Sequence, residues 1–396
     1  MRACLKKSDL ERIVSRFGRA AGRKAVAPNL FDRDFRPPID LSLFKAYNKS
    51  AAISHVLLRD EMMKQIPEEN RYGRERVKVY FEGGYEDEAD VVVGADGNHS
   101  KINRQLGLNN IAPLATHHPF ISKADVSVND LRNLPPKFLD GPNLAFINDL
   151  SFYFATYLPD MDASSADLKT GSCMFGIYVP VHLVPGEPST LSAAEKLDVL
   201  RLCIRDWAPQ YHQMLDMISD TDPYDYTAHV SQRPPVDWRA KARKTDPTDA
   251  VKGHPRIWLM GDAIHAMLPY RGQGGNQSML DAAKMLPYLQ ELARGSSDAP
   301  VKQAQEFYEA EMMERTFAWV EKSGGRNIMP FDSAKWWTWW GFAAFRPVWS
   351  VYCGVYELGL RMGLIGREGF VDDAPELKYY DAASVQLEHR DSTTLA

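Results

Sequence analysis

The sequence predicts an α/β fold in which a Rossmann-like domain is interrupted by a mostly antiparallel sheet domain and followed by a helical C-terminal region. Two short apolar runs, 89–93 and 257–260, predict buried strands, and each leads into a turn that contains glycine and aspartate. Aromatic and β-branched residues crowd the runs 145–147, 152–157 and 174–179, which is typical of antiparallel strands.

The composition is typical of globular, soluble proteins, and the net charge of −5 gives no indication of a nucleic-acid partner. The four cysteines are scattered without a CxxC pair, which argues against a metal site and a disulfide framework. The chain opens without the continuous apolar run of a secretion signal. We therefore expect a cytoplasmic protein.

Residues 1–24 are basic and poor in acidic residues, and their apolar residues recur at helical spacing. A mitochondrial transit helix has this character but is also rich in serine, which is sparse here. We therefore favour an exposed amphipathic helix. Residues 25–50 contain several prolines and are typical of an extended connector.

A strand end is predicted at 56–58, followed directly by Arg59 and a helix; an arginine in this position is most often a surface charge. The runs 76–81 and 89–93 predict two strands around an acidic turn, which is typical of a solvated hairpin tip. The second strand leads to residues 94–100, Gly-Ala-Asp-Gly-Asn-His-Ser. Taken alone, this segment is an ordinary turn.

The inserted sheet domain is predicted between about 114 and 252. A helix over 191–207 should bury one face, which carries Leu197, Leu200, Ile204 and Trp207. The charged run 239–249 is interpreted as a loop that returns to the Rossmann-like domain. Four tyrosines are candidate contacts for a phenolic ligand, although most such tyrosines are core residues with a satisfied hydroxyl: Tyr153, Tyr157, Tyr178 and Tyr226.

The segment 256–281, RIWLMGDAIHAMLPYRGQGGNQSMLD, has the clearest chemical character. A buried strand leads to Gly261-Asp262, then to a loop with one proline and three glycines, and then to a helix that begins near Asn276. Glycine lets the main chain approach a ligand closely, and a helix N-terminus offers unpaired N–H groups and about half a positive charge. Together these features predict a site for a polar cofactor.

The C-terminal region is predicted to be helical over 278–293 and 301–322, with Pro287 kinking the first helix or beginning a second segment. Residues 336–365 contain five tryptophans, but their charged residues and Pro347 argue against a transmembrane span. We expect a helix pair at an interface or a subunit contact. Contact of 336–365 with a membrane surface is the less favoured alternative.

The segment 256–281 resembles the second flavin motif of the FAD-dependent aromatic hydroxylases, the para-hydroxybenzoate hydroxylase-like monooxygenases. That motif reads Gly-Asp-Ala-x-His, then proline, then a glycine-rich turn, and it is matched by Gly261, Asp262, Ala263, His265, Pro269, Gly272, Gly274, Gly275 and Asn276. Residues 94–97 resemble the Asp-Gly motif of the same family. The run 267–274 is most similar to the fungal branch that acts in secondary metabolism.

The resemblance implies FAD as the cofactor and NAD(P)H as co-substrate. The FAD-binding residues that it implies are Arg59, Asp96, Gly97, Asp262, Pro269, Gly272, Gly274, Gly275 and Asn276. It implies no metal, and it assigns no catalytic side chain. The family usually has an arginine where this chain has Asn103.

A domain of this kind should open with a strand and a Gly-x-Gly-x-x-Gly turn that receives the pyrophosphate. Gly18 and Gly22 have the wrong spacing, so the Rossmann-like FAD-binding domain is N-terminally incomplete. The chain is either a shortened gene model or a variant that has lost part of its dinucleotide site. The predicted parts are 1–110 and 253–330 for the FAD-binding domain, 111–252 for the substrate domain, and 331–396 for the C-terminal region.

The activity implied by the resemblance is hydroxylation of an aromatic or polyketide-type small molecule with NAD(P)H and O2. The missing turn motivates an alternative, a degenerate flavin-fold protein without redox activity that serves as a pocket or a binding protein. A third hypothesis is a tryptophan-rich interaction or membrane-surface protein in which the fold is only a scaffold.

Overall fold

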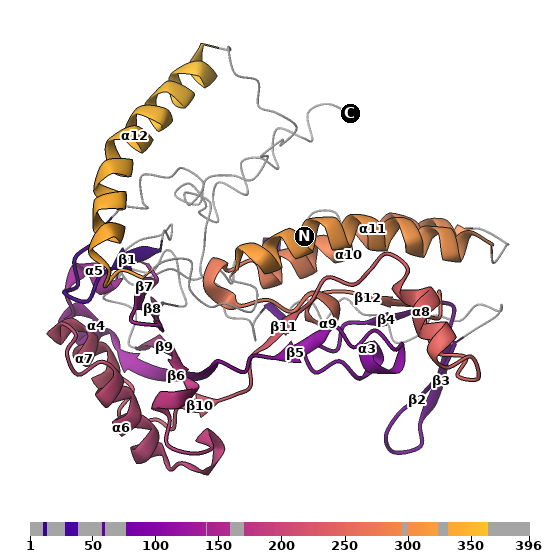
Figure 1. Cartoon of the computed structure of the whole chain (residues 1–396), viewed down its shortest axis with the longest axis horizontal. Coiled ribbons are helices and arrows are strands. Elements are labelled where there is room, and N and C mark those ends of the chain that lie inside the picture. The colour runs from indigo at the N-terminus through magenta and orange to yellow at the C-terminus, as the bar shows by residue number, and fades with distance from the viewer. Residues whose placement is uncertain are drawn as a thin grey trace. The chain divides into compact units, whose positions relative to one another are not determined.

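The computed structural model describes residues 11–13, 28–38, 58–59, 77–139, 141–158, 170–294, 299–323 and 332–362. The chain forms two compact units (Figure 1). Unit 1 comprises residues 1–10, 65–115 and 227–328, and unit 2 comprises residues 11–64, 116–226 and 329–396. The central segment of unit 2 therefore begins at 116, and the chain returns to unit 1 at 227. The sequence suggested 111 and 253 for these two positions.

The described residues of unit 1 form three pairs of short strands. The pair β4 (Val92–Gly94) and β12 (Ile257–Leu259) is parallel, and β5 (Ile111–Pro113) with β11 (His229–Ser231) is antiparallel. The third pair is the hairpin of β2 (Val77–Tyr80) and β3 (Glu86–Ala89). The helices are α3 (Lys101–Gln105), α8 (Trp238–Thr245), α9 (Asp262–His265), α10 (Gly274–Arg294) and α11 (Ala299–Lys322).

The predicted strand 89–93 is two strands, because the chain changes its partner at Asp90. Ala89 still pairs with β2, whereas Val92 begins the pairing with β12. Arg256 stabilises the change, since its guanidinium donates to the carbonyl of Asp90 at 3.0 Å and its carbonyl accepts from the N–H of Val92 at 2.8 Å. One continuous strand was therefore the wrong prediction.

The charged run 239–249 is also not a loop, since most of it belongs to α8. Arg239 is buried and donates to both carboxylate oxygens of Glu309 on α11, at 2.6 to 3.2 Å. It also donates to the carbonyls of His254 and Ile257, which flank the start of β12. A charged side chain buried to this extent needs such partners, and the sequence of the run does not indicate which of its charged residues is buried.

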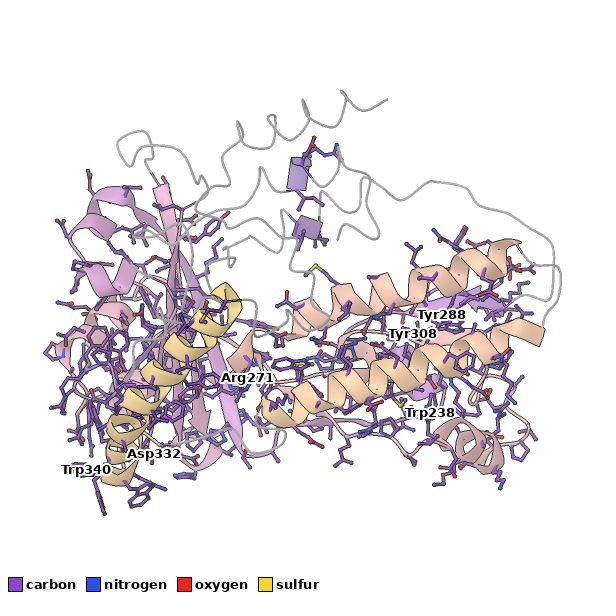
Figure 2. The ribbon with its side chains drawn as sticks, turned by 90° about the horizontal axis from the view of Figure 1, so that it is seen from above. Trp238, Arg271, Tyr288, Tyr308, Asp332 and Trp340 are labelled. Atoms are coloured by element: carbon purple, nitrogen blue, oxygen red, sulfur yellow. The ribbon has the colours of Figure 1, made fainter. Side chains whose placement is uncertain are left out.

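Helices α10 and α11 run side by side (Figures 1 and 2). Helix α10 continues through Pro287, so Pro287 does not begin a second segment, and the predicted kink stays a prediction. Pro287 is exposed, and the carbonyl that loses its helical donor can take one from water. Tyr308 of α11, labelled in Figure 2, stacks on Trp258 at 5.6 Å and donates to the carbonyl of Leu259 at 3.1 Å, which fixes α11 against β12.

Unit 2 is built on a six-stranded sheet with the order β1-β7-β8-β9-β6-β10. Only the β1–β7 pair is parallel, so the mostly antiparallel sheet predicted from the sequence is confirmed. The strands are β1 (Asn29–Phe31), β6 (His117–Ser127), β7 (Asn143–Ile147), β8 (Leu150–Tyr157), β9 (Thr170–Pro180) and β10 (Tyr224–Asp225). Short helices α4 (Val128–Arg132) and α5 (Pro136–Leu139) follow β6.

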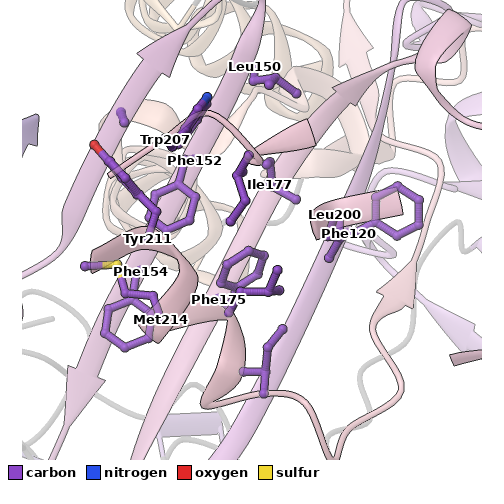
Figure 3. Packing of buried hydrophobic residues seen from close by; sticks show 14 of the residues in the cluster. Phe120, Leu150, Phe152, Phe154, Phe175, Ile177, Leu200, Trp207, Tyr211 and Met214 are labelled. Carbon is purple, nitrogen blue, oxygen red and sulfur yellow. The ribbon is translucent and has the colours of Figure 1, made fainter. Parts of the chain in front are cut away.

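One face of this sheet packs against α6 (Ala193–Cys203) and α7 (Pro209–Asp216). Alternate residues of a strand point to the same face, and Phe152 and Phe175 meet there at 5.2 Å (Figure 3). The four residues predicted on the inner face of 191–207 are all buried, although α6 ends at Cys203. Helix α6 begins with a capping box between Ser192 and Glu195.

The sequence predicted a helix pair over 336–365. The described part of this segment is the single helix α12 (Trp336–Arg361), so the prediction is wrong for that part. Among the described residues, no helix is both long enough and apolar enough to cross a membrane.

Candidate functional site

The candidate site of unit 1 begins at the carboxyl ends of two adjacent strands. Strands β4 and β12 are parallel, and Leu259 lies opposite Gly94. The turns that carry Asp96 and Asp262 therefore leave the sheet at the same edge. In open α/β sheets, ligands bind outside this edge of the strands.

Asp96 uses its carboxylate within the turn. It accepts from the Ser100 hydroxyl at 2.6 Å, from the Lys101 N–H at 2.7 Å and from the Ile102 N–H at 3.2 Å. These bonds satisfy the start of α3, and Gly97 has a φ of +76° that allows the turn. Asp96 thus shapes the edge of the site, and its contact with FAD stays a prediction.

Two buried asparagines hold the second turn. Asn103 donates to the Asn110 side chain and to the carbonyl of Ala263, both at 2.8 Å. Asn110 donates to the carbonyl of Ile264 at 2.8 Å and to that of Gln232 at 2.9 Å. The four-residue helix α9 leaves these carbonyls without helical donors, so the two amides replace them. The sequence showed Asn103 only as a departure from the family and gave no signal for Asn110.

Gly261 begins the second turn in a conformation that requires glycine. Its φ of +59° and ψ of −147° lie in a region that other residues avoid. A Cβ at this position would lie 2.8 Å from the Ser278 hydroxyl oxygen. Its N–H donates to Asp281 at 2.9 Å, and its carbonyl accepts from the N–H of His265 at 2.9 Å.

Asp281 of α10 connects this turn to α11. It is fully buried, as is His265, whose Nε2 contacts Asp281 Oδ2 at 2.6 Å. Arg315 of α11 donates to Asp281 Oδ1 at 2.8 Å and to Gln277 at 2.6 Å. Arg315 also pairs with Glu311, and these carboxylates outweigh burial and raise the pKa of the guanidinium. The sequence indicated no chemical role for Arg315 or for Asp281.

His265 therefore faces the interior. Its Nε2 donates to the carboxylate of Asp281, because an ionised carboxylate can only accept. Its Nδ1 has no hydrogen-bond partner within the part of the chain that the structure describes. His265, a residue of the family motif, thus supports the turn from the protein interior.

Asp262 directly follows Gly261 in the second turn, and its side chain lies at the surface. Its carboxylate makes no hydrogen bond with any described residue. Nearby protein atoms displace water from it and raise the pKa of the carboxyl, while His265 acts in the opposite direction. Asp262 is thus a hydrogen-bond acceptor held in place by its neighbours and available to a ligand.

The glycine-rich loop places backbone beside Asp262. Pro269 begins a 3-10 turn, and Gly272 follows with a φ of +60°. A Cβ at Gly274 would lie 3.9 Å from Asp262 Oδ1, whereas a Cβ at Gly272 or Gly275 would meet nothing within 4 Å. The loop thus leaves open space at the start of α10, next to the carboxylate.

Two side chains hold the loop in this position. Asn276 donates to the carbonyl of Gly272 at 3.1 Å, so its amide supports the turn. Arg271, labelled in Figure 2, donates to the carbonyl of Lys322 at the C-terminal end of α11, at 2.7 Å. A cation at a helix C-terminus is favourable for the helix dipole.

These groups fit the ribityl and pyrimidine part of FAD. An ionised carboxylate accepts from hydroxyl groups, and the first N–H groups of α10 lack helical acceptors and can donate to carbonyl oxygens. The open glycine positions admit a flat ring close to the backbone. Asp96 and Gly97 follow the end of the neighbouring strand. Six other predicted residues lie together in the second turn and the glycine-rich loop: Asp262, Pro269, Gly272, Gly274, Gly275 and Asn276.

Arg59 is not among the residues that the structure brings together. It is exposed in the short described piece 58–59, which belongs to unit 2, and its contact with FAD stays a prediction. The segment in which the pyrophosphate turn was sought, around Gly18 and Gly22, lies outside the described residues.

The second face of the sheet in unit 2 has tyrosines on neighbouring strands. Tyr153, Gly176 and Ile121 lie side by side across three strands, on the face opposite α6 and α7. The hydroxyls of Tyr178 and Tyr226 are 2.9 Å apart. Burial raises the pKa of Tyr153 and of Tyr226, so both phenols stay protonated and can donate at neutral pH.

Comparison with known proteins gives the site its chemical context. Residues 219–322 match the family model of the FAD binding domain. The FAD-dependent monooxygenase thnD of Trichoderma harzianum is 25% identical over 260 residues, which cover 62% of this chain and 59% of that protein. The FAD-dependent monooxygenase tazP of Aspergillus terreus is 26% identical over 222 residues, which cover 54% and 52%. The chain therefore spans little more than half the length of these relatives.

The fold has a counterpart among solved structures. HpxO of Klebsiella pneumoniae, complexed with FAD and uric acid, aligns with a TM-score of 0.56 and 19% identity over 80% of this chain and 73% of that one. The predicted α/β fold with an inserted sheet domain is thereby confirmed. Residues 219–322 thus match an FAD-binding domain, and the chain is similar in sequence to FAD-dependent monooxygenases and in fold to HpxO.

Proposed function

We propose that this protein is an FAD-dependent monooxygenase that hydroxylates an aromatic or polyketide-type small molecule with NAD(P)H and O2, in the biosynthesis of a secondary metabolite. The observation that carries the proposal is the position of Asp262, whose available carboxylate lies beside the open glycine backbone at the start of α10. The fungal monooxygenases that the chain resembles support the same class of activity.

When bound, FAD supplies the redox chemistry by accepting electrons from NAD(P)H and using them to activate O2. The chain supplies position and electrostatics. Asp262 would accept hydrogen bonds from the ribityl hydroxyls, and the N-terminus of α10 would stabilise negative charge on the pyrimidine ring. Preorganised donors of this kind are worth roughly 3–4 kcal/mol when charge develops near them.

The second sheet face of unit 2 is the proposed substrate surface. Its aromatic rings offer apolar contact to a flat molecule, and its protonated phenols, Tyr153 and the Tyr178–Tyr226 pair, can donate to a carbonyl or a phenolate oxygen. A polyketide-type phenol has both kinds of group. The residues of this face thus match the chemistry of the proposed substrate class.

A direct test is the colour and the redox response of the purified protein. We expect it to bind FAD, to show the flavin absorbance band, and to lose that band when NADPH or NADH is added without oxygen. Protein that stays colourless in excess FAD would contradict the proposal. Protein that binds FAD but is not reduced would favour the degenerate flavin-fold alternative.

Gly275→Ala should separate cofactor binding from stability. A Cβ at Gly275 meets nothing in the protein, so alanine should stabilise α10 by up to about 1 kcal/mol. The same methyl group would occupy the space offered to the flavin, so we expect the Kd for FAD to rise about tenfold, or ~1.4 kcal/mol. Isothermal titration and thermal unfolding measure the two effects.

The matched control is Gly341→Ala in α12, which also places a Cβ in open space. It should change stability by a similar small amount and leave FAD affinity unchanged. Equal affinity of the Gly275→Ala variant and the wild type would mean that FAD does not approach the start of α10.

The pKa of Asp262 predicts a pH dependence of FAD affinity. Nearby protein atoms displace water from the carboxylate and raise this pKa, so the carboxylate becomes protonated at a higher pH than an ordinary aspartate. Binding that uses the ionised form is complete above this pKa and is lost as the pH falls through it. We expect the Kd for FAD to rise on acidification, and this rise should begin at a higher pH than the titration of an ordinary aspartate, whose pKa is about 3.9, would produce.

Asp262→Asn keeps the shape of the side chain and removes the titration. This variant should bind FAD more weakly at neutral pH, by about 1.5–3 kcal/mol, because hydrogen bonds to charged groups are the stronger ones. Its affinity should depend less on pH than that of the wild type. Parallel pH profiles for the two proteins would rule out Asp262 as the titrating group.

A further inference from the structure

Helix α12 is held to unit 2 at its beginning. Just before the helix, Ser333 contacts the carbonyl of Phe146 through both its N–H and its hydroxyl, at 2.8 and 2.7 Å. Asp332, labelled in Figure 2, accepts from the N–H of Asn148 at 3.1 Å. Arg36 lies 5.4 Å above the ring of Trp339. These contacts fix the start of the helix on the sheet of unit 2.

The rest of α12 exposes an apolar stripe. Its members recur at intervals of three, four or eight residues, which is the spacing of one helical face, and they are 56–70% exposed: Trp336, Trp340, Val348, Val351, Val355 and Leu358. Figure 2 shows Trp340 at the beginning of this stripe. Soluble proteins rarely expose a continuous apolar surface of this extent without a partner.

The stripe is also wide. Three more exposed aromatic residues lie beside the stripe: Trp337, Phe345 and Tyr352. Each directly follows another exposed residue of the helix, namely Trp336, Ala344 and Val351. Since each residue turns the helix by roughly 100°, the apolar surface covers well over a quarter of the helix circumference. A second helix contacts a narrower seam of positions, whereas a flat surface contacts a broad one.

The residue types indicate which flat surface this is. Tryptophan and tyrosine favour the boundary between water and hydrocarbon, and three of the exposed aromatic residues are tryptophans. The charged residues of 335–361 are Lys335, Arg346 and Arg361 against Glu357 alone, an excess of basic residues. Basic residues next to an apolar helix face attract anionic lipid headgroups.

We propose that α12 lies in the interface of an anionic lipid membrane, with its exposed stripe towards the acyl chains. A helix in this orientation inserts only about 5–10 Å, so it needs a broad apolar face and not a fully apolar segment. This agrees with the finding that no described helix is suited to span a bilayer. The proposal concerns unit 2 alone and does not depend on the binding of FAD.

The test uses the full-length protein and vesicles of phosphatidylcholine, with or without phosphatidylserine. We expect the protein to float with the phosphatidylserine vesicles, with an affinity that falls as salt is added. The double variant Trp340→Gln/Val351→Gln should lower the fraction bound at least about tenfold, because both residues lie on the stripe. Its thermal unfolding should be unchanged, since both side chains are exposed.

Tyr80→Gln is the matched control, because Tyr80 is an equally exposed aromatic residue of the β2–β3 hairpin. It should bind vesicles like the wild type. Absence of flotation with anionic vesicles would overturn the proposal. So would an oligomer in light scattering that the stripe variant dissociates while vesicle binding stays unchanged, since a second copy of the chain would then cover the stripe.

Discussion

Asp281→Asn should lower the free energy of unfolding by about 3–5 kcal/mol, the usual effect of removing one partner from a buried charge pair. Asp281 accepts from Arg315, His265 and the N–H of Gly261, and it is fully buried. Asparagine has nearly the same shape but no charge, so Arg315 loses one of its two carboxylate partners. Urea unfolding without added FAD measures this effect.

A matched control for Asp281→Asn is Glu291→Gln, which removes a carboxylate from an exposed position of the same helix. It should change the free energy of unfolding by less than about 0.5 kcal/mol. If Asp281 acts through Arg315, the double variant Asp281→Asn/Arg315→Gln should be less destabilised than the sum of the two single variants. Additive effects would contradict a direct interaction between the two side chains.

Gly261→Ala should be destabilising by about 2–6 kcal/mol. The φ and ψ of Gly261 cost any other residue about 1–3 kcal/mol. The added Cβ would also lie 2.8 Å from the Ser278 hydroxyl, and overpacking of this kind adds about 1–3 kcal/mol. Because the same turn holds Asp262, we expect the variant to lose bound FAD together with its stability.

The second variant, Gly261→Ala/Ser278→Ala, separates the two causes. Removing the hydroxyl relieves the closest contact but leaves the backbone strain, so stability should recover only in part. Full recovery in urea unfolding would mean that the turn tolerates a side chain and that the contact alone disfavours it. Recovery of stability without recovery of FAD binding would show that the turn itself has moved.

The edge of the site could be predicted from the sequence because its features are local. A strand end, a glycine and an aspartate follow one another in the chain, both at 94–96 and at 259–262. The two segments are paired in the structure, as the parallel arrangement of a Rossmann-like sheet requires. The family resemblance then indicated the cofactor, and the match over 219–322 agrees with it.

The groups that hold the edge in place could not be predicted, because each depends on a partner distant in sequence. Arg315 and Asp281 are 34 residues apart, and neither differs in the sequence from an ordinary surface residue of a helix. Asn103 and Ala263 are 160 residues apart. The change of strand partner at Asp90 depends on Arg256 in the same way. Local propensity carries no information about such pairs.

The inserted unit also has a consequence for the order in which the protein folds. Asn103 is synthesised 160 residues before the carbonyl that it contacts at Ala263. At a synthesis rate of about 5–20 residues per second, this delay is on the order of 10–30 s. During that time β4 lacks β12, the described strand with which it pairs, whereas the strands from β6 to β9 have already been synthesised. We therefore expect the cofactor edge of unit 1 to assemble after the antiparallel strands of unit 2 have been synthesised.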